Sequence, residues 1–245
     1  MTNKQKKGIL IEFEGLDCTF KETNSKALLE YIKTKTDRKC VLVSYPRYDK
    51  ESSCFVRQYL SGGYGNRPED IDPDIGMIAY ALDRYDDWMT GLKDIYENGG
   101  IIIADRYTLS NIIYQGAKVE TYRLAEFMSK VIKLENKTFG LPKPDIAILM
   151  DMPYEIAREL MGKKNADDIH EQNDSYMKRV YFTYNHIRGY MERRQMFNNN
   201  CMAKTISCAD LTTNTPRSRE DIFKDIVEFV DENMKNLLKG EYRDV

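Results

Sequence analysis

The chain has 245 residues, of which 42% are hydrophobic and 31% are charged, and its formal net charge is −2. This composition is ordinary for an α/β enzyme of one domain, and the mixed charges exclude a basic face for nucleic acid while leaving room for a small anionic ligand. The five cysteines have no disulfide spacing and no signal peptide precedes them, which predicts a cytoplasmic protein. No apolar run approaches the roughly 20 residues that cross a bilayer, so the protein is expected to be soluble and to have no membrane partner.

Strand and helix patterns alternate along the chain, as they do where helices cover both faces of a parallel sheet. Five short apolar runs predict parallel strands at 8–14, 39–45, 100–106, 144–152 and 202–208. Helical patterns are present at about 23–35, 52–60, 72–98, 107–117, 120–136, 154–161, 173–197 and 218–239. The fold class is therefore α/β, a single three-layer α/β/α domain with a five-stranded parallel sheet over residues 1–245. The polar segment 162–173 predicts a surface loop, where a lid would lie.

The first predicted strand leads into a loop that starts with Gly15 and a helix that opens at Lys21. These two residues have the spacing of a phosphate-binding loop, GxxxxGK[ST], in which backbone N–H groups surround a phosphate and the lysine reaches its outer oxygens. Two positions depart from the pattern, because Phe20 replaces the second glycine and Glu22 replaces the hydroxyl residue. Thr23 is the residue that can supply the missing hydroxyl group.

These departures leave three interpretations open. The loop can be a working phosphate site that binds ATP less well, because Phe20 strains the backbone and the Glu22 carboxylate repels the phosphate. Glu22 can instead contact Mg²⁺ directly or through water. Thr19 and Glu22 also have the spacing of a capping box, which would satisfy the helix N-terminus with side chains in place of a phosphate.

Charged side chains follow four of the predicted strands. They are Glu14, Asp17 and Lys21 after the first strand, Arg47 after the second, Asp105 and Arg106 after the third, and Asp151 after the fourth. Ligands of open parallel sheets bind beyond the carboxyl ends of the strands, so these residues are expected to share one site. The planar guanidinium of arginine binds two phosphate oxygens at once through paired N–H groups. Arg47 and Arg106 therefore predict a second phosphate site, facing the one at the loop of Gly15 and Lys21.

With these residues in place, the chain resembles the thymidylate kinases. The motifs that carry the resemblance are FEGLD at 13–17, YPR at 45–47, AYALDRYD at 79–86, DRYTLSNIIYQGAK at 105–118, LPKPDIAILMDMP at 141–153 and DDIHEQNDSYMKRV at 167–180. The resemblance covers about residues 8–229 and implies a P-loop NTPase fold of the nucleoside monophosphate kinase type. It also implies transfer of the γ-phosphoryl group of ATP to dTMP, which gives dTDP, with ATP and Mg²⁺ as cofactors, nucleotides as partners and a homodimer as an open option.

The resemblance also implies roles for single residues. The catalytic group is Asp17, Lys21, Asp105 and Arg106, and the acceptor dTMP is bound by Arg47, Tyr80, Arg84, Tyr107, Asn111, Tyr114 and Gln115. Among these, Tyr80 would stack on thymine, Asn111 and Gln115 would read the base edge, and Tyr114 would lie against the sugar C2′. ATP is bound by Gly15, Lys21, Glu22, Thr23, Lys163 and Lys164, the last two in place of the usual lid arginine, and Mg²⁺ is held by Glu22 and Asp105. His170 is expected to be exposed in the lid and is assigned no role.

The expected mechanism is in-line transfer without a general base, because the acceptor phosphate is already an anion. A deoxynucleoside kinase is one alternative, but it would need a carboxylate base for a neutral hydroxyl group, and the three arginines Arg47, Arg84 and Arg106 argue against it. A kinase-fold protein that binds nucleotides without transferring phosphate is another alternative, and Phe20 and Glu22 support it.

Plain structural roles also remain open for three of these residues, of which Tyr114 can be a simple packing residue. Tyr80 can be a core residue, and Arg84 can pair with Asp83 or Asp87 on a solvated helix face.

Overall fold

The structure, a computed structural model, describes residues 8–162, 168–193, 196–197, 200–239 and 241. Its main sheet has five parallel strands in the order β2-β3-β1-β4-β5, as the sequence predicted. They are β1 (Ile9–Glu14), β2 (Cys40–Ser44), β3 (Ile101–Asp105), β4 (Ile146–Asp151) and β5 (Met202–Ser207). The three central strands are near-continuous apolar runs because helices cover both of their faces.

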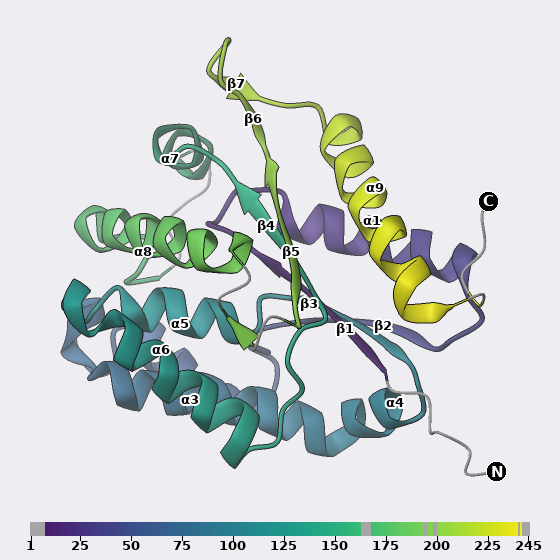
Figure 1. The fold of residues 1–245 in the computed structure, drawn as a ribbon. Coiled ribbons are helices and arrows are strands. Elements are labelled where there is room, and N and C mark those ends of the chain that lie inside the picture. Colours follow the sequence, from purple (N-terminus) through teal and green to yellow (C-terminus); the bar gives the residue numbers. More distant parts are fainter. Residues whose placement is uncertain (1–7, 163–167, 194–195, 198–199, 240, 242–245) are drawn as a thin grey trace.

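Helices form the two outer layers. They are α1 (Lys21–Lys35), α2 (Cys54–Leu60), α3 (Pro73–Asp87), α4 (Lys93–Glu97), α5 (Thr108–Gly116), α6 (Leu124–Ile132), α7 (Tyr154–Gly162), α8 (Asp174–Glu192) and α9 (Arg219–Leu238). Figure 1 shows α1 and α9 on one side of the sheet and α3, α5, α6 and α8 on the other. Two hydrophobic clusters correspond to this division, one between the sheet and α1 with α9, the other between the sheet and α5, α6 and α8. The expected three-layer α/β/α fold is therefore confirmed.

Some boundaries differ from the sequence prediction. The single helix expected over 72–98 is divided into α3, a π-helical turn at Trp88–Leu92 and α4, because Gly91 has a non-helical φ of 166°. The helix expected over 120–136 likewise ends in a π-helical turn, Lys133–Thr138. A short antiparallel hairpin of β6 (Ala209–Asp210) and β7 (Thr215–Pro216) was not predicted.

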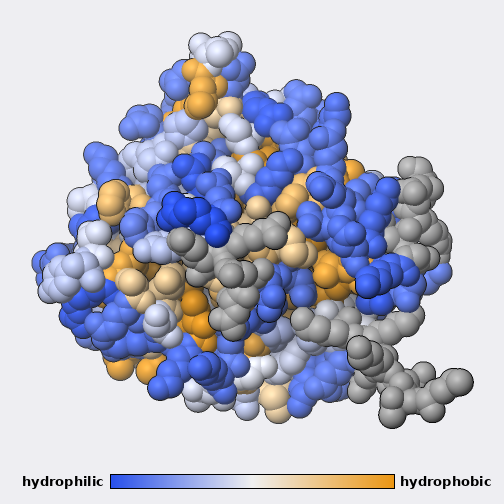
Figure 2. Space-filling view, in the orientation of Figure 1, coloured by the Kyte–Doolittle hydropathy of each residue, from blue (hydrophilic) through white to orange (hydrophobic). Residues whose placement is uncertain are grey.

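The surface seen in Figure 2 is mostly hydrophilic, with small hydrophobic areas, one of them on the β6–β7 hairpin at the top of the view. Within the described part of the chain, no helix combines the length and the hydrophobicity that a bilayer crossing requires.

The carboxyl ends of the central strands lie at one edge of the sheet. Phe13 of β1 is in register with Asp105 of β3 and with Ile148 of β4, so the loops that follow these strands begin side by side. The loop after β1 leads into α1, and the loop after β3 leads into α5. This edge is where an open parallel sheet binds ligands.

Candidate active site

The loop between β1 and α1 keeps the shape of a phosphate loop despite its sequence. Phe20, in the position of the second glycine, has φ 62° and ψ 20°, which is the left-handed conformation that glycine adopts without penalty. A non-glycine residue there costs about 1–2 kcal/mol. The Phe20 side chain packs against the hydrophobic cluster beside α1, and this contact offsets part of the strain. Gly15 is needed at its position, because a Cβ atom there would lie 2.5 Å from the Met150 carbonyl oxygen.

The capping-box interpretation is wrong. The N-cap residue of α1 is Phe20, and within the described residues no side chain caps this helix start. Thr19 instead donates its hydroxyl proton to the Leu16 carbonyl at 2.7 Å, and the Glu22 side chain, which is 74% exposed, pairs with Lys26 at 2.6 Å. An N-terminus without a side-chain cap is suited to bind an anion through its backbone N–H groups.

Lys21 lies inside this loop, almost fully buried, and donates from Nζ to the Leu16 carbonyl at 2.5 Å. Burial and the nearby Arg106 lower the pKa of Lys21, while Asp17, Asp105 and Glu14 act in the opposite direction. Lys21 lines a cleft together with Glu22, Thr23, Asp105, Asp17 and Arg106, which we call the loop cleft. The Oδ1 atom of Asp105 is buried and has no hydrogen-bond partner among the described residues.

A second cavity, which we call the inner pocket, lies next to the loop cleft. Of the predicted residues it is lined by Asp17, Tyr80, Arg84, Arg106, Asn111, Tyr114 and Gln115. Asp17 and Arg106 line both cavities, so the inner pocket and the loop cleft meet at these two side chains.

Arg106 is the centre of the polar contacts at this junction. Its guanidinium forms an ion pair with Asp17, lies 3.4 Å from Glu14, and stands 5.1 Å from the ring centroid of Tyr114. The Tyr114 hydroxyl donates to Asp17 at 3.3 Å. Burial alone would raise the pKa of Asp17, but Arg106 and Lys21 hold it below its usual value. Asp17 is therefore ionised at neutral pH.

The inner pocket is also lined by amide side chains with polar atoms that lack hydrogen-bond partners among the described residues. Both polar side-chain atoms of Gln115, and Oδ1 of Asn111, are buried and have no hydrogen-bond partner within the described residues. A buried polar group without a partner costs about 1–3 kcal/mol, which a bound ligand can recover. Gly76 makes room for Gln115, because a Cβ atom at Gly76 would lie 2.2 Å from Gln115 Oε1.

Arg84 is buried and lies against the inner pocket. Its Nε and Nη2 atoms bind the two carboxylate oxygens of Glu135 at 2.9 and 2.5 Å. The same carboxylate accepts hydrogen bonds from Thr108 and Asn111, both at 2.8 Å. The interpretation of Arg84 as a solvated partner of Asp83 or Asp87 is therefore wrong.

Comparison with known proteins decides the family. The sequence model of thymidylate kinase matches residues 13–202. The chain belongs to the thymidylate kinase family. Thymidylate kinase of Caenorhabditis elegans is 29% identical over 170 residues, covering 66% of this chain and 71% of the relative. That of Caldicellulosiruptor saccharolyticus is 26% identical over 237 residues, covering 94% and 98%.

A solved structure supports the fold. Thymidylate kinase from Candida albicans superposes with a TM-score of 0.69 at 18% identity, over 98% of this chain and 96% of that one. These comparisons confirm the expected P-loop NTPase fold. They also confirm the expected phosphotransferase activity, which is phosphorylation of dTMP by ATP, and do not favour a deoxynucleoside kinase.

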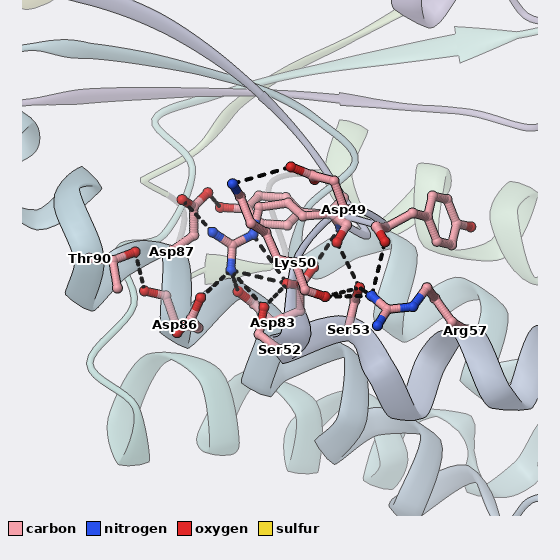
Figure 3. Close-up of polar contacts among 12 residues, drawn as sticks. Asp49, Lys50, Ser52, Ser53, Arg57, Asp83, Asp86, Asp87 and Thr90 are labelled. Carbon is pink, nitrogen blue, oxygen red and sulfur yellow. Dashed lines mark hydrogen bonds and ion pairs between the residues drawn. The ribbon is translucent and has the colours of Figure 1, made fainter.

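Arg47 of this thymidylate kinase is not brought to the inner pocket or to the loop cleft. Its guanidinium is held by Asp83, Asp86 and Asp87 at 3.1, 2.6 and 2.8 Å. Figure 3 shows these three side chains grouped around one guanidinium, with Ser52 beside them. Because α3 presents three carboxylates to it, Arg47 is bound within the protein in this structure, and its contact with the acceptor phosphate stays a prediction.

Tyr107 also differs from its expected role. It is buried in a hydrophobic cluster with Tyr45 and does not line the inner pocket. The Arg84 guanidinium lies 5.9 Å from the Tyr107 ring centroid and 6.0 Å from that of Tyr45. Tyr107 thus packs near the Arg84 guanidinium in the protein interior and helps to position it. Tyr80 is half-buried and packs on a cluster that includes Tyr59 and Leu60, as the core interpretation predicted. It also lines the inner pocket, so its stacking on thymine stays a prediction.

The described part of the predicted lid contributes residues that sequence reasoning missed. The expected lid lies between the ends of α7 and α8, and its residues Lys163 and Lys164 fall outside the described residues. Asp168, His170 and Glu171 line the inner pocket. His170 was expected to be exposed, but it is only 5% exposed and packs against Tyr59, Tyr114 and Tyr176. The apolar Ile169 beside it is the one signal of burial within this polar stretch.

Proposed function

We propose that dTMP occupies the inner pocket, that ATP occupies the loop cleft, and that the two phosphate chains meet at Asp17 and Arg106. The observation that carries this proposal is that these two side chains line both cavities. Two polyanions that meet there need cations, and Lys21 and Arg106 provide them. Arg106 would keep its ion pair with Asp17 and offer its remaining N–H groups to the acceptor phosphate, since charge-assisted hydrogen bonds to phosphate are among the stronger ones.

The base would lie beside the amide side chains that line the inner pocket. The unpartnered amide of Gln115 and the Oδ1 atom of Asn111 can bind the polar edge of thymine, while Tyr80 covers its face. Arg84 would offer its remaining guanidinium edge to a carbonyl oxygen of the base, since Glu135 occupies Nε and Nη2. Tyr114, whose ring centroid lies 5.1 Å from the Arg106 guanidinium, would lie along the sugar.

Mg²⁺ fits the loop cleft at Asp105. The buried Oδ1 atom of this carboxylate lacks a partner among the described residues, and Mg²⁺ is commonly bound by one or two carboxylates together with substrate phosphates. Glu22 lines the same cleft and is the second candidate ligand. When bound, the ion would neutralise phosphate charge. Thr23 offers a hydroxyl to the same cleft, and Lys163 and Lys164 are proposed as the lid cations.

The chain's own residues position and neutralise the reactants. Asp17 is ionised and fixes the Arg106 guanidinium through an ion pair. Lys21 is held inside the loop by the Leu16 carbonyl, so its ammonium group is oriented before ATP binds. The acceptor phosphate attacks as an anion, and no residue is required as a general base.

We also propose that the chain works as one cytoplasmic domain that forms a homodimer through α3. Ile75, Ile78, Leu82 and Met89 are exposed hydrophobic residues at helical spacing on one face of α3 and the turn that follows it. Such a stripe is unusual on a monomer surface. Cys40, Cys54, Cys201 and Cys208 are free thiols, as expected in a reducing compartment.

A coupled ADP-release assay tests the central proposal. Purified protein with ATP and Mg²⁺ is expected to turn over dTMP faster than dCMP, dAMP or dGMP. Turnover of none of the four nucleotides, or equal turnover of all, would contradict the assignment of the inner pocket to dTMP. Sedimentation of the wild type and of Leu82→Glu tests the homodimer, which the charged substitution should dissociate.

A further inference from the structure

We propose that Glu12 is a positioning residue for the acceptor nucleotide. Its carboxyl group binds the first turn of α5 from inside the sheet, and it thereby fixes the wall of the inner pocket that α5 forms. The phosphate chemistry of the site does not use this side chain. The inference rests on the proposed binding of dTMP in the inner pocket.

The sheet makes room for the Glu12 side chain. Glu12 lies in the central strand β1 and is fully buried, which is rare for a glutamate without an ion-pair partner. The residues in register with it are Ala104 of β3 and Ala147 of β4, both fully buried. Residues in register on adjacent parallel strands point to the same face of the sheet, so the two short side chains leave space for the longer one between them. The Glu12 side chain therefore extends from the middle of the sheet toward α5.

Glu12 caps α5 from this position. Its Oε1 atom accepts a hydrogen bond from the Leu109 N–H group at 2.8 Å. Leu109 is the second residue of α5, and the first four N–H groups of a helix have no partner within the helix. The N-cap residue Tyr107 makes no side-chain hydrogen bond to this helix start. Glu12 thus supplies from β1 the acceptor that a capping residue usually supplies from its own helix.

Three buried glutamates share the first turn of α5. They bind three consecutive residues, Glu135 the Thr108 hydroxyl, Glu12 the Leu109 N–H group and Glu14 the Ser110 hydroxyl. Glu135 is also paired with Arg84, and Glu14 with Arg106. Within the described part of the chain Glu12 has no ion pair, so of the three only Glu12 is bound to α5 alone.

The carboxyl group of Glu12 is neutral. Burial, and after it the charges of Glu14 and Glu135, raise the pKa of Glu12 well above its usual value, whereas the hydrogen bond from Leu109 and the charge of Arg84 act in the opposite direction. The titratable and charged groups around it are Glu14, Glu135, Arg84, Tyr107 and Cys201. Arg84, the one cation among them, is bound to both carboxylate oxygens of Glu135. The Oε2 atom of Glu12, which has no hydrogen-bond partner among the described residues, therefore carries the proton.

The turn that Glu12 holds controls the inner pocket more than the loop cleft. Four residues of α5 line the inner pocket, namely Ser110, Asn111, Tyr114 and Gln115. No described residue of α5 lines the loop cleft. Arg106, which precedes α5 by two residues, lines both cavities. A displaced first turn of α5 would therefore weaken the binding of dTMP more than that of ATP.

Two substitutions separate the hydrogen bond from the bulk of the side chain. Glu12→Gln keeps an oxygen for Leu109 and, like the neutral acid, carries no charge. Glu12→Leu has a similar size and removes the acceptor. Ile11→Val is the matched control, because Ile11 is also fully buried in β1 but belongs to the hydrophobic cluster on the other face of the sheet. The measurements are KM for dTMP and KM for ATP in the coupled ADP-release assay, at a temperature at which each variant is folded.

We expect Glu12→Leu to raise KM for dTMP by about 2- to 10-fold, the factor that one neutral hydrogen bond gives, and to change KM for ATP by less than about 2-fold. Glu12→Gln and Ile11→Val should leave both values close to those of the wild type. Unchanged values in Glu12→Leu, or equal increases for dTMP and ATP, would reduce Glu12 to a structural role. A Glu12→Gln variant as impaired as Glu12→Leu, or an Ile11→Val variant with the same increase for dTMP, would overturn the assignment to the hydrogen bond.

Hydrogen exchange in the wild type keeps the inference testable if Glu12→Leu does not fold. We expect the Leu109 amide proton, whose acceptor is Glu12, to exchange slowly. Saturation with dTMP should slow it further than a non-hydrolysable ATP analogue does, because a ligand that binds the held form of α5 favours that form. Exchange as fast as that of an exposed amide, or equal slowing by the two ligands, would contradict the inference. A wild type that does not turn over dTMP would instead contradict the proposed function.

Discussion

Replacing Glu135 by glutamine should destabilise this thymidylate kinase far more than breaking an exposed ion pair. The Glu135 carboxylate is fully buried and accepts four hydrogen bonds, two from Arg84 at 2.9 and 2.5 Å and one each from Thr108 and Asn111 at 2.8 Å. Glutamine has the same shape, but its NH₂ group would face donors that now bind an oxygen. The charge of Arg84, which is 2% exposed, would also lose its partner.

The expected loss follows from this burial. Removing one partner of a buried ion pair costs about 3–5 kcal/mol, because the other charge is left without compensation. In a protein of this size each kcal/mol shifts Tm by about 2–4 °C, so Tm should fall by about 6–20 °C. Glu135 also holds Arg84 and Asn111 at the wall of the inner pocket, so the variant should bind dTMP more weakly.

Urea unfolding followed by circular dichroism gives the free energy of unfolding, and Glu30→Gln is the matched control. Glu30 pairs with Lys33 at 2.7 Å, but both side chains are exposed, so this substitution should change the free energy by less than about 1 kcal/mol. Equal losses in the two variants would refute the conclusion that the buried carboxylate compensates the charge of Arg84.

Three further predictions concern the other parts of the site. Arg106→Gln should lower kcat/KM for dTMP by about 10-fold or more, since a charge-assisted bond contributes about 1.5–3 kcal/mol, whereas Arg47→Gln should chiefly lower Tm; the reverse order would contradict the assignment of the phosphate contact to Arg106. Phe20→Gly combined with Glu22→Thr should tighten ATP binding by about 5-fold, measured by calorimetry. The repulsion between Glu22 and ATP is at the low end of the range for two like charges, because Glu22 is exposed and paired with Lys26. Unchanged affinity would show that neither residue weakens ATP binding. Burial raises the pKa of Glu12 well above 4.5, so the folded protein keeps a proton that the unfolded chain loses. Stability from this group therefore falls as the pH rises above 4.5, and the unfolding free energy of Glu12→Gln should increase relative to that of the wild type as the pH rises above about 5; the absence of this increase would contradict the shift.

The sheet and the loop residues could be predicted because both depend on local patterns. Buried strands such as β3 are short apolar runs, and their order of alternation with helices is visible along the chain. Two features of the site likewise depend only on residues that are close in the chain. They are the spacing of Gly15 and Lys21, and the acidic and basic neighbours Asp105 and Arg106 at the end of β3. The division of the helix at Gly91 was missed because a single glycine is tolerated in many helices.

The partners of the other arginines could not be predicted, because they are distant in the chain. Asp83 is 36 residues from Arg47, and Glu135 is 51 residues from Arg84. Without the fold, Arg47 and Arg106 were equivalent candidates for a phosphate, since each follows a strand. The difference between them is tertiary, because α3 surrounds Arg47 with carboxylates, whereas the inner pocket opens beside Arg106. His170 was hidden for the same reason, as its burial comes from α2, α5 and α8.

The conformation of Phe20 bears on whether the loop still serves a phosphate. A loop that closed the helix start with its own side chains would have no need for a left-handed residue before Lys21, and phenylalanine there costs about 1–2 kcal/mol. The structure nevertheless has Phe20 at φ 62°, turns the Thr19 hydroxyl away to the Leu16 carbonyl and keeps Lys21 inside the loop. Strain of this kind persists where the surrounding structure enforces it, and it is common at binding sites. The loop therefore keeps a glycine-like conformation at Phe20 and holds Lys21 inside, which favours a working donor site over a kinase fold that has lost its phosphate loop.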